Sequence, residues 1–113
     1  MKNKITDVKI NIDVINESVL GEKSNWESSV KISGNITKIK SDTWNKFDTE
    51  NALKAIVETF EVLNSECKVK LITNSPIIYS LLNKKGASSY EYMELSEKVE
   101  EIKSKHKISC FIK

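Results

Sequence analysis

The chain has 113 residues, with 18 Lys and no Arg against 16 Asp and Glu, and its formal net charge is +2. This length supports one hydrophobic core and is too short for two, so the sequence predicts a single domain over residues 1–113. The interspersed acids leave only a small overall excess of positive charge, too little to indicate a nucleic-acid-binding surface, and the lack of Arg removes the side chain that most often reads guanine in the DNA major groove.

Alternating apolar residues predict three strands in the first part of the chain. Val8–Val14 has an apolar residue at every second position, which is the period of a half-buried strand. Trp26–Ser33 repeats this pattern, and Gly34-Asn35 then separates it from Ile36–Lys40 as a two-residue hairpin turn. These segments predict an antiparallel meander of three strands.

After Lys40 the spacing of apolar residues lengthens to that of a helix. The stripe over residues 49–63 consists of Leu53, Ile56, Val57, Phe60 and Leu63. Asp48 or Thr49 is the expected N-cap of this helix, and Asn64 is the expected left-handed residue that ends it.

The remaining elements are a strand, two helices and a last strand. Lys68–Thr73 has the composition of a short strand, and Ser75-Pro76 predicts the N-cap and first turn of a helix that ends near Gly86. Residues 88–91 have the pattern of a capping box. The helix that follows has an apolar stripe made of Tyr92, Leu95, Val99 and Ile102. Ile108–Ile112 is the expected fifth strand.

The predicted order β-β-β-α-β-α-α-β defines a mixed five-stranded sheet. Right-handed crossovers would place the fourth and fifth strands parallel to the first and all the helices on one face of the sheet. The other face, open to water or to a partner, would then carry the polar residues Lys9, Asn11, Asp13, Glu27, Ser29, Lys31, Lys38 and Lys40.

The two cysteines and the single histidine favour structural roles. Cys67 and Cys110 lie beside or inside strand-like segments, which is typical of reduced core thiols rather than of a zinc site. His106, in a Lys-His-Lys sequence at a helix end, favours a surface role that complements the helix dipole. No apolar segment has the length of a signal peptide core or a membrane span, which predicts a cytoplasmic protein without a membrane partner.

Two segments carry a likeness to a known family. Thr49–Leu63 resembles the first helix of ribonuclease H-like proteins, and Cys67–Ser75 resembles their fourth strand, which runs into a Thr-Asp-Ser sequence at the start of the next helix. Asp13 lies near the end of the first predicted strand, where the family keeps its first metal-binding aspartate. The resemblance implies a ribonuclease H-like fold of the α+β or α/β class.

The same resemblance implies a loss of catalytic residues. Family members hold two Mg²⁺ ions with four carboxylates, because phosphodiester cleavage uses clustered anions around two cations. Asn74 stands where the family has Asp, Ala52 stands at the position of the helix glutamate with Glu50 two residues away, and Val14 replaces the usual Gly. The final helix of the family and its carboxylate are also expected to be absent. The resemblance therefore implies a truncated member with a vestigial site at Asp13, Glu50 and Asn74.

The first functional hypothesis is a binding module without a cofactor. It would bind nucleic acid, either RNA or an RNA–DNA hybrid, or a protein, through the uncovered face of the sheet. The candidate contact residues are Lys9, Lys31, Lys38, Lys40 and Trp44. Lysines bind phosphates, and Trp44 would either stack on a base or pack against the protein.

The sequence leaves two alternatives open. One is an active Mg²⁺-dependent nuclease whose site is rebuilt from Asp13, Glu50 and either Glu17 or Glu58. The other is a small α+β adaptor or inhibitor unrelated to the family. No metal ligand set with a recognised spacing occurs in the sequence, so a metal is expected only under the nuclease alternative.

Overall fold

The computed structural model describes residues 6–17, 24–43, 49–83 and 92–113. In chain order the elements are β1 (Thr6–Glu17), β2 (Ser24–Ile32), β3 (Asn35–Thr43), α1 (Thr49–Phe60), β4 (Cys67–Thr73), α2 (Pro76–Asn83), α3 (Met93–Lys105) and β5 (Lys107–Ile112). This order confirms the sequence of strands and helices predicted from the periodicity.

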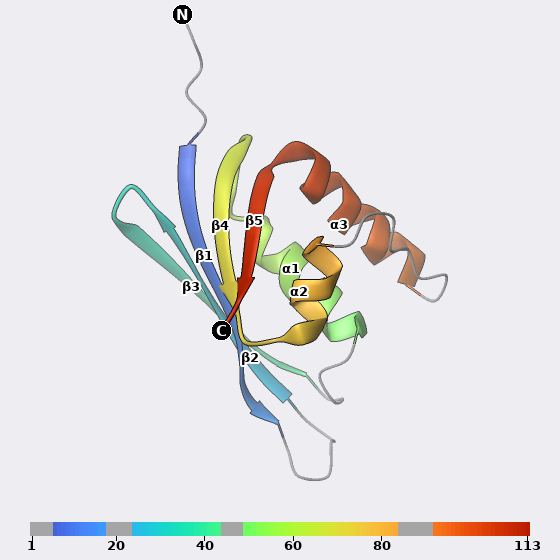
Figure 1. Cartoon of the computed structure of the whole chain (residues 1–113). Helices are drawn as coiled ribbons and strands as arrows, with labels where there is room; N and C mark the ends of the chain where they lie inside the picture. Colours follow the sequence, from blue (N-terminus) through green and yellow to red (C-terminus); the bar gives the residue numbers. More distant parts are fainter. Residues whose placement is uncertain (1–5, 18–23, 44–48, 84–91) are drawn as a thin grey trace, which may run out of the picture.

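The strands form one mixed sheet in the spatial order β3-β2-β1-β4-β5. β1, β2 and β3 pair antiparallel, β4 pairs parallel with β1, and β5 pairs parallel with β4. Figure 1 shows α1, α2 and α3 on the same side of this sheet. The predicted mixed five-stranded sheet with helices on one face is therefore confirmed for the described part of the chain.

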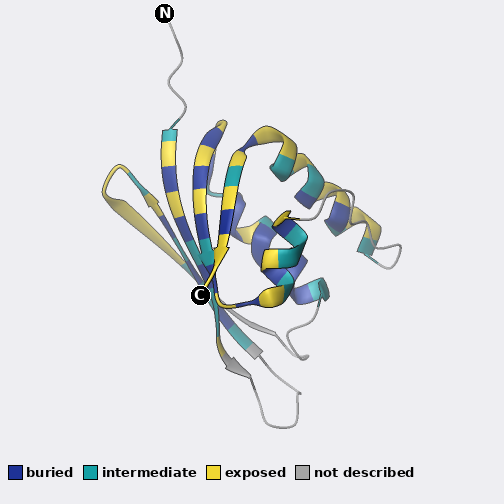
Figure 2. Cartoon of the chain, viewed as in Figure 1, coloured by how far each residue is buried: buried dark blue, intermediate teal, exposed yellow. Residues whose placement is uncertain are grey.

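The hydrophobic core lies between the sheet and the helices. Buried and exposed residues alternate along the strands in Figure 2, because neighbouring side chains of a strand point to opposite faces of the sheet. Trp26 is 2% exposed and lies in this core, and both cysteines are free and buried. A buried hydrogen bond of 2.8 Å between the hydroxyl groups of Thr59 and Ser28 ties α1 to β2.

The turn between β2 and β3 differs by one residue from the prediction. Ile32 pairs with Asn35, so the two turn residues are Ser33 and Gly34 rather than Gly34 and Asn35. Both have positive φ, 49° and 87°, as a type I′ hairpin turn demands. Gly34 meets the second of these at no steric cost.

Two predicted helix signals have different outcomes. α1 ends at Phe60, and among the described residues other than glycine only Ser33 has a positive φ, so the left-handed stop at Asn64 was wrong. Ser75 does cap α2, because its Oγ accepts a hydrogen bond from the backbone N–H of Ile78 at 3.3 Å. Asp48, Gly86 and the predicted capping box at residues 88–91 lie outside the described residues.

His106 is buried, which corrects the predicted surface role. It is 6% exposed at the end of α3, and its Nδ1 accepts a hydrogen bond from the backbone N–H of Cys67 at 3.0 Å. Burial lowers the pKa of His106, and the nearby Lys105 charge lowers it further, against a smaller opposing effect of Glu66. A histidine with a lowered pKa is neutral at pH 7, so His106 does not act as a positive charge on the helix dipole.

Within the described residues, none of the helices combines the length and the apolar composition that crossing a membrane demands.

Candidate functional site

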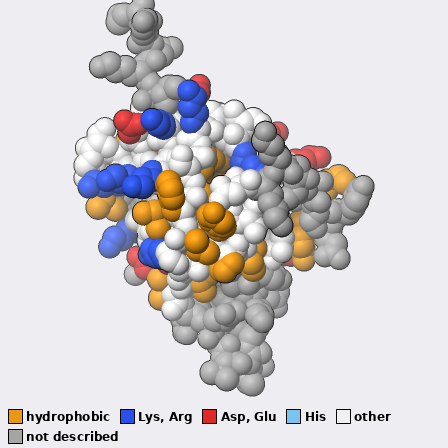
Figure 3. Space-filling view, viewed as in Figure 1, with side chains coloured by type: hydrophobic (Ala, Val, Ile, Leu, Met, Phe, Trp, Pro, Cys, Tyr) orange, Lys and Arg blue, Asp and Glu red, His pale blue; other side chains and the backbone are white. Residues whose placement is uncertain are grey.

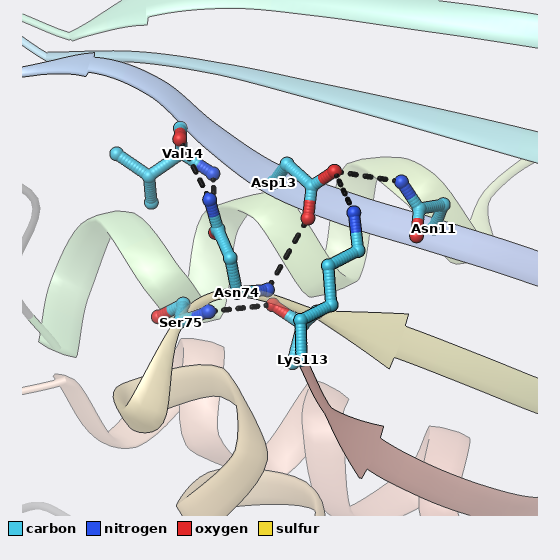
Figure 4. A network of polar contacts seen from close by, with 7 residues as sticks. Asn11, Asp13, Val14, Asn74, Ser75 and Lys113 are labelled. Atoms are coloured by element: carbon cyan, nitrogen blue, oxygen red, sulfur yellow. Dashed lines mark hydrogen bonds and ion pairs between the residues drawn. The ribbon is translucent and has the colours of Figure 1, made fainter.

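Asp13 is the centre of a polar cluster at one end of the sheet (Figure 4). Its Oδ2 accepts hydrogen bonds from Asn11 Nδ2 at 2.7 Å and from Lys113 Nζ at 2.6 Å, and its Oδ1 accepts one from the backbone N–H of Asn74 at 3.2 Å. Only 17% of the Asp13 side chain is exposed. The carboxylate is therefore occupied by three donors, one from β1, one from the residue after β4 and one from the residue after β5, and the last of these is an ammonium group.

Asn74 follows β4 and continues the pairing between β4 and β1 with its side chain. Its Oδ1 accepts a hydrogen bond from the backbone N–H of Val14 at 2.8 Å, and its Nδ2 donates one to the backbone oxygen of Val14 at 2.9 Å. This pair of bonds uses a donor and an acceptor in the way that two strands do, which an amide can provide and a carboxylate cannot. Figure 4 shows the Asn74 amide turned toward Val14.

The structure brings Asp13 and Asn74 together but joins neither to Glu50. The Glu50 carboxylate pairs with Lys54 at 3.1 Å, and no hydrogen bond or ion pair connects it to Asp13, although both side chains are described. Ala52 is fully buried on α1.

The nuclease alternative also includes Glu17 and Glu58. The side chain of Glu17 lies outside the described part. Glu58 is exposed on α1, where partial burial and then the Glu61 charge raise its pKa. No group of three or more His, Cys, Asp or Glu side chains among the described residues has the arrangement of a metal site.

The oxygen atoms of Asp13 and Asn74 do not fit the pair of Mg²⁺ ions that the resemblance implies. Mg²⁺ gives up its water reluctantly and is held in proteins by clustered carboxylates and substrate phosphates. Among the described side chains, Asp13 is the one carboxylate in this cluster, and it already pairs with the Lys113 ammonium. The amide oxygen of Asn74, Oδ1, already accepts a backbone hydrogen bond from Val14.

The face of the sheet away from the helices is rich in lysine. Its described lysines come from all five strands and are Lys9, Lys31, Lys38, Lys68, Lys70 and Lys107, against the acids Asp7, Asp13 and Glu27. Lys31, Lys9 and Lys70 stand side by side across β2, β1 and β4, since Lys9 pairs in register with both of the others. No described carboxylate forms an ion pair with any of these three side chains. They make a row of positive charge across the sheet.

Two depressions lie on this face and share the lysine row. One has a volume of about 630 Å³ and includes Lys68 and Phe111, and the other has a volume of about 250 Å³ and includes Ile36 and Ile72. Lys9, Lys31 and Lys70 line both. We call the combined surface the lysine groove, formed by Lys9, Lys31, Lys68, Lys70, Ile36, Ile72 and Phe111. In Figure 3, Lys side chains gather over the strands on the left of the view, beside hydrophobic side chains.

The structure gives the side-chain positions of three of the five predicted contact residues. Lys9, Lys31 and Lys38 are exposed on the open face, as predicted, whereas Trp44 and the side chain of Lys40 lie outside the described residues. Lys68, Lys70 and Phe111 lie on the same face but were not among the predicted contact residues. The signal for the two lysines was present in β4, where exposed lysines alternate with buried residues through Cys67–Thr73. That alternation places every second residue on the same face as Lys9.

Comparison with known proteins identifies the fold. No protein-family model matches the sequence, and no curated protein matches it. Solved structures do match. The N-terminal RNase H domain of Rv2228c from Mycobacterium tuberculosis has a TM-score of 0.64 at 8% identity, over 96% of this chain and 84% of that one. LC11-RNase H1, solved in complex with an RNA/DNA hybrid, has a TM-score of 0.67 at 13% identity, over 95% and 86% of the two chains. The chain therefore has a ribonuclease H-like fold.

Proposed function

We propose that this protein is a catalytically degenerate ribonuclease H-like domain that binds nucleic acid through the open face of its sheet. The observation that carries the proposal is the row Lys31, Lys9 and Lys70, which stands across three neighbouring strands without a described acidic partner. Phosphates are the ligands that complement such a row, because binding them releases condensed counterions.

The cost of this row to folding supports a role in binding. Like charges directly opposite each other on neighbouring strands destabilise a sheet, and Lys9 has a lysine neighbour on each side. Alternating the signs of these charges would remove the repulsion. A polyanion bound over the row would also remove the repulsion. Nucleic acid binding would therefore relieve an unfavourable interaction of the isolated protein.

The arrangement at Asp13 supports the absence of family-type cleavage. Lys113 supplies the positive charge that the Asp13 carboxylate would otherwise receive from a metal ion, and the Asn74 amide is engaged with the backbone of Val14. Among the structural relatives, LC11-RNase H1 was solved with an RNA/DNA hybrid, which supports nucleic acid rather than a protein as the partner class.

The proposal is tested by incubating an end-labelled RNA–DNA hybrid, a single strand and a duplex with the protein in Mg²⁺, then measuring both the bound fraction and the length of the label. We expect binding to at least one of these nucleic acids with every strand intact. Shortened strands, with cleavage abolished by Asp13→Asn, would support the nuclease alternative. No binding to any of the three would leave a protein partner as the explanation of the lysine face.

A further inference from the structure

The lysine groove contains exposed apolar side chains that the core does not use. Phe111 on β5 is 50% exposed and Ile36 on β3 is 58% exposed, and each lines a depression together with Lys9, Lys31 and Lys70. Exposed apolar groups set among charges indicate contact with a partner that has an apolar surface as well as an opposite charge. Nucleic acid has both properties only where its base faces are accessible.

The position of Phe111 allows a base to stack on its ring. The Lys70 ammonium lies 5.7 Å from the centroid of the Phe111 ring, so an aromatic surface and a phosphate-binding cation adjoin each other. An exposed cation–π contact is weak, so Lys70 can leave the ring for a phosphate at little cost. β2 to β5 span three inter-strand spacings, about 14 Å, which gives a single strand room to lay its backbone along the lysine row.

A duplex fits this groove less well than a single strand. Its bases are stacked on one another, so a side chain on a sheet can reach the phosphates but not the flat base surfaces. A duplex would contact only the lysines, through its phosphates, and the exposed ring of Phe111 would make no contact with a base.

We propose that the lysine groove binds single-stranded nucleic acid, with the backbone along Lys31, Lys9 and Lys70 and a base stacked on Phe111. This inference rests on the proposed function, since it assumes that the open face binds nucleic acid. It adds that the protein prefers unpaired to paired nucleic acid, and it assigns this preference to Phe111.

The test compares Phe111→Ala and Phe111→Tyr with the wild type by fluorescence anisotropy, using labelled oligo-dT and oligo-U of about 12 nucleotides and a DNA duplex and an RNA–DNA hybrid of equal length. Tyr79→Ala is the matched control, because Tyr79 is an aromatic residue 37% exposed on α2, on the helix side of the sheet. Melting temperatures establish that each variant is folded.

We expect the wild type to bind single strands more tightly than the duplex or the hybrid. Phe111→Ala should weaken single-strand binding by about tenfold, which is typical of losing one base stack, while Phe111→Tyr and Tyr79→Ala retain it. Equal binding of paired and unpaired strands, with no effect of Phe111→Ala, would overturn the single-strand inference and leave the proposed function in place. Loss of all binding in the wild type would instead overturn the proposed function.

Discussion

Lys9→Glu is expected to abolish most nucleic-acid binding and at the same time to stabilise the fold. Lys9 is the middle residue of the lysine row, paired in register with Lys31 on β2 and Lys70 on β4. A glutamate there removes one phosphate contact and places a negative charge against the bound backbone. We expect the affinity to fall by more than about tenfold at low salt, because the loss of a contact and the new repulsion act together.

The stability effect of Lys9→Glu has the opposite sign. The new carboxylate would lie between two ammonium groups and convert two like-charge pairs into ion pairs, each contributing about 0.2–1 kcal/mol across a sheet. Asp7, which has its side chain on the same face of β1, offsets part of this gain. A net gain of about 0.5–1 kcal/mol corresponds to a rise in the melting temperature of about 2–8 °C for a domain of this size.

Lys98→Glu is the matched control for Lys9→Glu. Lys98 is exposed on α3, on the other side of the molecule, and both substitutions change the net charge of the chain by the same amount. We expect Lys98→Glu to retain binding. Equal loss of binding in the two variants would mean that total charge rather than the lysine row determines affinity, and a fall in the melting temperature of Lys9→Glu would contradict the proposed repulsion within the row.

Asn74→Asp is expected to destabilise the protein although it restores the residue that the resemblance calls for. The introduced carboxylate can accept the hydrogen bond from the Val14 N–H but cannot donate to the Val14 oxygen, which lies 2.9 Å from the present donor. It also adds a negative charge beside Asp13. We expect a loss of about 2 kcal/mol, measured as a decrease of about 10 °C in the melting temperature at pH 7.

The pH dependence of Asn74→Asp distinguishes this cause from a general loss of packing. A protonated carboxyl group can donate to the Val14 oxygen, so the pKa of the introduced group should be raised in the folded protein. The folded state then binds the proton more tightly than the unfolded state, and the deficit relative to the wild type shrinks as the pH falls below about 5. Asn64→Asp, at an exposed position after α1, should be nearly neutral. A deficit that is constant with pH would contradict the role given to the Asn74 amide.

Local periodicity was sufficient to predict the sheet and its covering helices. The alternation in β1 and β2 and the helical spacing in α1 arise from burial of one face, and such burial leaves a regular pattern in the sequence. The predicted turn was one residue too late because Gly34 can occupy either position of a two-residue turn. The pairing of Ile32 with Asn35 decides between the two positions.

The candidate site was less predictable because its contacts join distant parts of the chain. The bonds between Asn74 and Val14 span 60 residues, and the pair between Lys113 and Asp13 spans 100. No local pattern indicates that an ammonium group will meet the first aspartate. His106 was misassigned for the same reason: its neighbours in the sequence are lysines, while its burial depends on the packing of its ring against Phe60, 5.6 Å away.

The most direct test of the account is the salt dependence of the wild-type affinity for a labelled single strand. Three phosphate contacts by Lys31, Lys9 and Lys70 predict a slope of about −2 in a plot of log K against log salt concentration, and additional contacts by Lys38 or Lys68 would steepen it. A slope of this size, together with measurable binding at low salt, is the result that the account predicts. Binding that does not change with salt, or no binding at low salt, would contradict the assignment of the lysine row as a phosphate-binding surface.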